Sequence, residues 1–239
     1  MRIRLLTYNI HKGVGGIDRR YDLDRVARVV THYSPDAVLL QEVLDSAPHS
    51  GQARDLAALL GYRHTAYVPH TKRWPGTQYG NAIFSRYPIA ETDHIDLTVP
   101  PKKRRGALHA RIRVRLPSGR SRTLHVFNLH LGLSGIERKI QLRRFIEKSP
   151  FAHLHSRAAI VVGGDFNDVW GTLGKNLLSP AGFLGTPRLP TFPAFAPLRA
   201  LDSLYIRGDI RMVHDQRGGI DIARAASDHL PLIADMELE

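Results

Sequence analysis

From Leu108 to Leu116 the sequence alternates between apolar side chains and His or Arg, with a period of two residues. This period is typical of a β-strand that buries one face and exposes the other. The next segment, Pro117–Arg120, has the composition of a hairpin turn, and Thr123–Leu131 supplies the partner strand. The sequence therefore predicts an antiparallel hairpin within a sheet.

Shorter apolar runs predict further strands, and apolar residues at helical spacing predict helices. The expected strands are Ile3–Asn9, Ala37–Gln41, Tyr62–Val68, Asn81–Ser85, Ala158–Gly163, Leu201–Ile206 and Leu230–Leu238. The expected helices are Tyr21–Tyr33, Gln52–Leu60 and a third that begins at a Ser134/Glu137 capping box and runs to about Lys148. Ala181–Pro197 is expected to be an ordered loop. Hairpins and crossovers together favour one α/β domain over residues 1–239, with sheets at its centre.

Composition excludes several classes of protein. The chain has 239 residues, of which 43% are hydrophobic, enough for a packed core. Cysteine is absent, which excludes disulfides, thiolate zinc sites, iron–sulfur clusters and a cysteine nucleophile. No signal peptide and no membrane span is visible in the sequence, so a soluble cytoplasmic protein is expected.

The formal net charge of +12 is concentrated in one segment. Residues 100–148 contain 14 Lys and Arg against two acidic residues, whereas the rest of the chain has 20 of each. A basic face favours a polyanionic partner such as nucleic acid, although a solvated surface explains the same charge. With Ser118-Gly119 as the tight turn, Ala107 would pair with His130. Lys102–Arg105 would then lie at the His130 end of the hairpin.

Polar residues recur at the ends of the predicted strands, where ligands commonly bind in layered sheets. Their carboxylate and amide oxygens suit Mg²⁺ or Mn²⁺ better than zinc or copper. The two histidines among them suit acid–base catalysis or stabilisation of an anionic transition state. These residues are Asn9, Glu42, His130, Asp165, Asn167, Asp202, Asp228 and His229.

At these positions the sequence resembles the endonuclease/exonuclease/phosphatase superfamily, which includes deoxyribonuclease I, neutral sphingomyelinases and inositol polyphosphate 5-phosphatases. The resemblance follows the order of the family's motifs from Asn9 to His229. It is most similar to a small bacterial branch that is sometimes encoded beside cardiolipin synthases. The motifs are Thr7-Tyr8-Asn9-Ile10, Gln41-Glu42-Val43, Gly80-Asn81-Ala82-Ile83, Asn128-Leu129-His130-Leu131, Gly164-Asp165-Phe166-Asn167-Asp168, Leu201-Asp202 and Ser227-Asp228-His229-Leu230-Pro231.

The resemblance implies a four-layer α/β/β/α sandwich of two mixed sheets with helices outside, as in deoxyribonuclease I. It also implies a divalent metal, Mg²⁺ with Mn²⁺ as the other candidate, held by Asn9, Glu42 and Asp228. Lys12 and Arg105 lie where relatives contact phosphate. The family often has an asparagine near Asn81 and another near Asn128, so both are expected to contact substrate.

Catalytic roles follow from the same resemblance. Asp165 would orient or deprotonate the attacking water, and Asn167 would hydrogen-bond the phosphoryl oxygen. His229, oriented by Asp202, would act as a second acid–base group, and His130 would bind the scissile phosphate or assist the leaving group. Whether Asp165 or His229 is the base stays open at this point.

The expected function is therefore metal-dependent hydrolysis of a phosphodiester. An anionic phosphate substrate is expected, with nucleic acid slightly favoured by the basic charge. A phospholipid or inositol phosphate is the alternative, by similarity to the lipid-acting members. A non-catalytic scaffold that binds polyanions is a second alternative, disfavoured because every catalytic position is filled.

Overall fold

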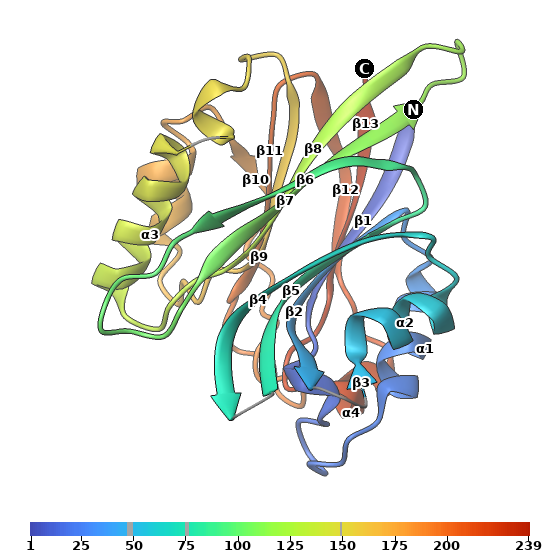
Figure 1. Cartoon of the computed structure of the whole chain (residues 1–239), viewed down its shortest axis with the longest axis vertical. Coiled ribbons are helices and arrows are strands. Elements are labelled where there is room, and N and C mark those ends of the chain that lie inside the picture. The colour runs from blue at the N-terminus through green and yellow to red at the C-terminus, as the bar shows by residue number, and fades with distance from the viewer. Residues whose placement is uncertain (47–49, 75–76, 149) are drawn as a thin grey trace.

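The computed structural model describes residues 1–46, 50–74, 77–148 and 150–239. Within these ranges the strands form two mixed sheets (Figure 1). The seven-stranded sheet has the order β12 (Ile210–Arg217), β13 (Leu232–Leu238), β1 (Arg2–Asn9), β2 (Ala37–Ser46), β5 (Thr77–Ser85) and β4 (His64–Trp74), with β3 (Ser50–Gly51) paired to β2. The six-stranded sheet has the order β10 (Leu184–Gly185), β11 (Asp202–Arg207), β9 (Ala159–Asp165), β8 (Ser121–His130), β7 (Gly106–Arg115) and β6 (Ile89–Asp96).

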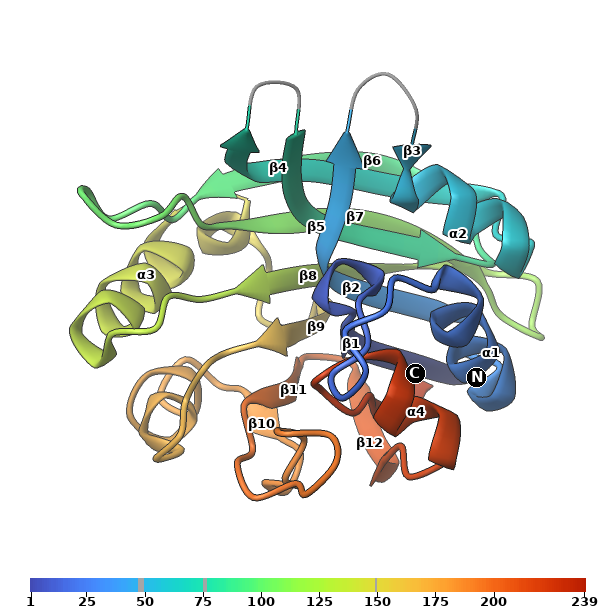
Figure 2. The same ribbon diagram turned by 90° about the horizontal axis from the view of Figure 1, so that it is seen from below.

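Helices cover the outer face of each sheet, which confirms the predicted four-layer sandwich. On one side lie α1 (Leu23–Tyr33), α2 (Gln52–Leu60) and α4 (Asp221–Ala226), and on the other lies α3 (Gly135–Glu147) (Figures 1 and 2). No helix in the described part of the chain is long and apolar enough to span a membrane.

Alternation along the strands explains the layers. Leu5 and Leu39 lie in a buried cluster with residues of β7 and β8, between the sheets. Their neighbour Leu6 lies in a second cluster with Val29 of α1, while Phe127 of β8 packs in a third with residues of α3. Successive strand residues point to opposite faces, so each central strand fills two apolar layers at once.

The helix boundaries follow from local capping. Asp22 caps α1 by accepting a hydrogen bond from the Arg25 backbone N–H, and Gly61 ends α2 in the left-handed region at φ 71°. The predicted capping box at the start of α3 is wrong. Ser134 makes no capping hydrogen bond, and Glu137 instead accepts one from the Gln141 side chain at 3.2 Å.

The β7–β8 hairpin forms as predicted, but its register differs by one residue. Ala107 pairs with Leu129 rather than with His130. The reason is a three-residue loop: the Leu116 N–H donates to the Arg120 carbonyl at 2.8 Å, and Gly119 takes φ 83°. A glycine in the left-handed region is typical of such loops.

Sequence reasoning missed β6, β12, α4, the two-residue strands β3 and β10 and three one-turn helices, and it made β2, β4 and β5 too short. Strands β6 and β12 are edge strands, the first largely exposed and the second mostly half-buried or exposed, so neither has the apolar periodicity of a central strand. Helix α4 is only six residues long. Strand β2 does not end before Glu42 but continues to Ser46, with a register shift against β5 between Leu40 and Val43.

Candidate active site

Nine of the twelve predicted site residues line one cavity of about 690 Å³. Several come from strand ends: Asn9 ends β1, His130 ends β8 and Asp165 ends β9. The nine are Asn9, Lys12, Glu42, Arg105, His130, Asp165, Asn167, Asp228 and His229. Asp202 lies behind this wall, against His229. The two remaining residues, Asn81 and Asn128, lie elsewhere.

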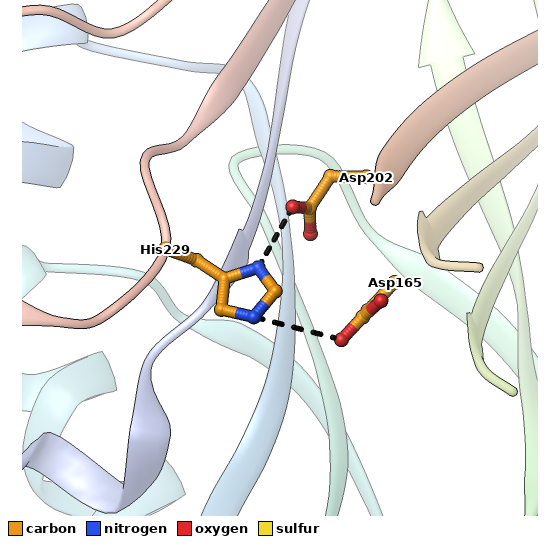
Figure 3. A group of neighbouring side chains, drawn as sticks. All are labelled: Asp165, Asp202 and His229. Atoms are coloured by element: carbon orange, nitrogen blue, oxygen red, sulfur yellow. Dashed lines mark hydrogen bonds and ion pairs between the residues drawn. The ribbon is translucent and has the colours of Figure 1, made fainter. Parts of the chain in front are cut away.

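His229 lies between two buried carboxylates (Figure 3). Its Nδ1–H donates to Asp202 Oδ2 at 2.8 Å, and its Nε2 lies 3.9 Å from Asp165 Oδ2. Asp202 Oδ2 also accepts a hydrogen bond from the Thr191 hydroxyl at 2.6 Å. The ring is therefore fixed in orientation, with Nε2 directed at Asp165. No signal in the local sequence of Thr191 indicates this role.

The charges of this group follow from its surroundings. Burial alone would lower the pKa of His229, but Asp202, Asp165 and Asp228 outweigh it and raise that pKa to about 10. Burial raises the pKa of Asp165 to about 6, against the attraction of His229. Burial lowers the pKa of His130 well below its usual value. At neutral pH the site therefore holds a cationic His229, an anionic Asp165 and a neutral His130.

Asp165 is held at its place by backbone geometry and by hydrogen bonds. Gly164 has φ 141°, and a Cβ atom there would lie 1.9 Å from the Leu129 carbonyl oxygen, so only glycine fits before Asp165. Asn9 Nδ2 donates to Asp165 Oδ2 at 3.0 Å, and the Asn167 backbone N–H donates to Oδ1 at 2.9 Å. His130 Nε2 lies 3.7 Å from Oδ2. One carboxylate thus faces two imidazoles at the cavity wall.

The residues predicted to hold a metal fit a hard cation by their chemistry. Glu42 and Asp228 line the cavity with carboxylates, and Asn9 carries an amide oxygen that also accepts a hydrogen bond from the His11 backbone N–H at 3.0 Å. Burial would raise the pKa of Glu42, but the Lys12 ammonium in contact with it outweighs burial and lowers that pKa. Glu42 also has φ 56°, which is rare for a non-glycine residue and typical of functional sites.

A second group of potential ligand atoms surrounds His229, and two of these atoms form a hydrogen bond with each other. Atoms of Asp165, Asp202 and His229 lie within 4.8 Å of one another. However, His229 Nδ1 and Asp202 Oδ2 are bonded to each other, and the cationic His229 would oppose a metal ion. A cation also touches the other group of donors, since the Lys12 ammonium contacts Glu42.

Asn81 and Asn128 do not line the cavity, so the expectation that they contact substrate is not supported. Asn128 joins the two sheets: its Nδ2 donates to the Leu40 and Ala82 carbonyls at 2.8 and 2.9 Å, and its Oδ1 accepts from Gln41 Nε2 at 2.8 Å. Asn81 Nδ2 donates to the Asn128 carbonyl at 3.0 Å. Both residues hold the sheets that carry the site.

The basic segment reaches the cavity in part. Lys103 and Arg105 line it, whereas α3 turns one of its cations inward, since buried Arg138 donates to the Leu133 carbonyl at 2.6 Å. Sequence reasoning also missed several wall residues that belong to no catalytic motif. They are Tyr79, Leu133 and Val169.

The fold and this site define a class of phosphoester hydrolases. A sequence model of the Endonuclease/Exonuclease/phosphatase family matches residues 6–229, and the chain belongs to this family. Uncharacterized protein YbhP of Escherichia coli strain K12 is 31% identical over 253 residues, which cover 98% of this chain and 96% of that protein.

Solved structures show the same fold. An endonuclease/exonuclease/phosphatase from Beutenbergia cavernae superposes with a TM-score of 0.83 at 27% identity, covering 99% of this chain and 72% of that one. The mannosyl-6-phosphatase Bt3783 of Bacteroides thetaiotaomicron has a TM-score of 0.73 at 18% identity, covering 99% of this chain and 100% of that one. At this low identity the second similarity concerns the fold alone.

Proposed function

We propose that this chain is a divalent-metal-dependent phosphodiesterase of the nuclease type. The observation that carries this proposal is the buried Asp165 carboxylate, which faces the imidazoles of His130 and His229 inside a cavity with cationic walls. Such a site can accept a proton from water, donate one to a leaving oxygen and neutralise a phosphate.

In the proposed reaction, Asp165 accepts a proton from the attacking water as the new oxygen–phosphorus bond forms. The bond to the leaving oxygen breaks on the opposite side, and the Nε2–H of His229 donates its proton to that oxygen. The raised pKa of His229, about 10, supports its role as the acid, and the pKa of Asp165, about 6, supports its role as the base.

The neighbouring residues would position the phosphate. The Asn167 side chain and neutral His130 would hydrogen-bond the phosphoryl oxygens, and Lys12 and Arg105 would attract the anion. Asn9, Glu42 and Asp228 would hold Mg²⁺ or Mn²⁺, which when bound offsets negative charge on a phosphoryl oxygen.

Nucleic acid is the substrate that the charge favours. Lys12, Lys103, Arg105 and Arg199 line the cavity, which suits a phosphate-rich chain. A phospholipid is the second candidate because exposed apolar side chains lie on the cavity wall or next in sequence to it. Leu133 on the cavity wall is 75% exposed, and Trp170 and Leu198, next in sequence to wall residues Val169 and Arg199, are 79% and 82% exposed.

A substrate panel with the purified protein and Mg²⁺ or Mn²⁺ tests the proposal. Supercoiled DNA, single-stranded DNA, RNA, cardiolipin, glycerophosphoinositol and bis(p-nitrophenyl) phosphate are compared with and without EDTA. We expect metal-dependent turnover that falls by several orders of magnitude in folded Asp165→Ala and His229→Ala, but not in Arg122→Gln, an exposed site at the other end of β8. Polyanion binding without turnover would favour a scaffold instead.

A further inference from the structure

A second cavity of about 480 Å³ lies beside the candidate active site, and Arg105 lines both. Its wall includes His70 of β4, His94 and Asp96 of β6, and Lys102 and Arg104 from the segment before β7. None of these five residues lines the first cavity. Arg105 therefore lies between the two cavities, so groups bound in both would be near neighbours.

The basic segment divides its side chains between the two cavities. Lys103 and Arg105 line the active-site cavity, whereas Lys102, Arg104 and again Arg105 line the second. Lys102 lies in a turn, where its backbone N–H donates to the Val99 carbonyl at 2.9 Å, and the four consecutive cations are divided between two neighbouring cavities. This arrangement gives a use for the Lys102 and Arg104 charges, which do not line the active-site cavity.

Two polar groups in the wall of the second cavity lack partners within the described parts of the chain. Arg105 is 7% exposed and its Nε–H makes no hydrogen bond, and His70 is 9% exposed with an unpartnered Nε2. The His70 ring stacks on His94 with centroids 5.1 Å apart. Buried donors normally have acceptors, so two unpartnered nitrogens indicate a ligand that offers them.

The charge of this cavity selects an anion. Among the described residues that line this cavity, Lys102, Arg104 and Arg105 stand with one carboxylate, Asp96, whose Oδ1 accepts a hydrogen bond from the Thr98 N–H at 2.9 Å. A metal ion is disfavoured by these three cations. Among the described residues, only Asp165, Asp202 and His229 bring three potential ligand atoms close together. His70, His94 and Asp96 form no such group, which also disfavours a metal ion in this cavity.

We propose that the second cavity binds a second phosphate group of the substrate, next to the phosphate that is hydrolysed. This inference rests on the proposed function and narrows it to substrates that carry two phosphates. Phosphate oxygens would accept hydrogen bonds from Arg105 and His70 and would neutralise Lys102 and Arg104. A nucleotide chain and a phosphorylated inositol ring both offer this chemistry.

Matched substrate pairs test the proposal and separate these two sources. One pair is TpT and TpTpT, and the other is glycerophosphoinositol and its 4-phosphate. For each pair we take the ratio of kcat/KM for the two-phosphate substrate to kcat/KM for its one-phosphate partner. In the pair that matches the natural substrate, the Lys102→Gln/Arg104→Gln double variant should lower this ratio about tenfold. The control Arg120→Gln/Arg122→Gln, which removes equal charge from exposed positions at the far hairpin end, should leave the ratio unchanged. An unchanged ratio in the first variant, or an equal fall in the control, would overturn the proposal.

A binding measurement keeps this inference separate from the proposed catalysis. Inorganic phosphate is titrated into the Asp165→Asn protein while the ring signals of His70 and His94 are followed by NMR. We expect saturable shifts that persist with the Arg120→Gln/Arg122→Gln change and weaken at least about tenfold with the Lys102→Gln/Arg104→Gln change. If phosphate leaves both ring signals unmoved, the second cavity is not a phosphate site. Absence of turnover on every substrate, with these shifts present, would reject only the proposed catalysis.

Discussion

The Nδ1 of His229 lies 2.8 Å from Oδ2 of Asp202, although the two residues are 27 positions apart. Both side chains are almost fully buried, and the carboxylate receives a second hydrogen bond from Thr191. The pair fixes the imidazole ring and directs its other nitrogen at Asp165. A buried imidazolium between two carboxylates is stable only because each charge has a partner.

Asp202→Asn should weaken the acid function of His229. The amide keeps the shape of the side chain but removes the charge that holds the His229 pKa high, so that pKa falls. We expect turnover to drop by roughly 10²-fold or more and the alkaline limb of the pH–rate profile to move to lower pH. The measurement is kcat/KM between pH 5 and 10. A uniform loss with an unmoved limb would indicate a structural role only.

The free energy of unfolding should depend on pH through the protonation of His229. Burial opposes the charged ring, but Asp202, Asp165 and Asp228 outweigh it and raise the folded pKa to about 10, above the ordinary value of 6.5. Because the pKa is higher in the folded state, protonation of His229 stabilises the fold fully below about pH 6.5. This stabilisation is lost as the pH rises through about 10. In urea unfolding of metal-free protein in EDTA, the stability advantage of wild type over His229→Gln should therefore shrink between pH 7 and 10. A pH-independent difference would contradict this.

Lys12→Gln should strengthen metal binding. The Lys12 ammonium contacts the Glu42 carboxylate, so it competes with a cation for that ligand and repels it. Calorimetric titration should show that Mn²⁺ binds the variant about fivefold more tightly than it binds wild type. This factor corresponds to ~1 kcal/mol, the scale of one such ion pair. Lys103→Gln removes a charge from the same cavity wall and is the matched control, with a smaller effect expected. Weaker binding by Lys12→Gln would mean that Lys12 helps to hold the metal site.

Asn128→Ala should destabilise the fold with little change at the metal site. The substitution leaves the Leu40 and Ala82 carbonyls and the Gln41 amide without a partner between the sheets. Leaving such groups unsatisfied should lower the free energy of unfolding by about 2–4 kcal/mol. Urea denaturation measures this loss, and Mn²⁺ affinity of the folded variant should stay within about twofold of wild type. Wild-type stability would show that these bonds are replaced by others.

Sequence reasoning predicted most of the central strands because these strands carry periodic apolar residues. It failed at edge strands β6 and β12, because β6 is largely exposed and β12 mostly half-buried or exposed, and neither has the pattern of a buried strand. It also misjudged the β7–β8 register, which a three-residue loop and the left-handed Gly119 decide. The resemblance to the family placed Asn81 and Asn128 at the substrate, with a role in fixing loops as the alternative, because a motif does not distinguish a polar residue between sheets from one on a cavity wall.

The sequence by itself determined the central strands, the main helices and the set of chemical groups, because apolar periodicity and strand-end motifs are local properties, and the resemblance to the family implied the four layers. Only the tertiary structure decided how those groups act on one another. Burial and mutual distance, which depend on the whole sandwich, raise the pKa values of His229 and Asp165. The same packing sends Lys103 into one cavity and Lys102 into the next, with Arg105 shared between them.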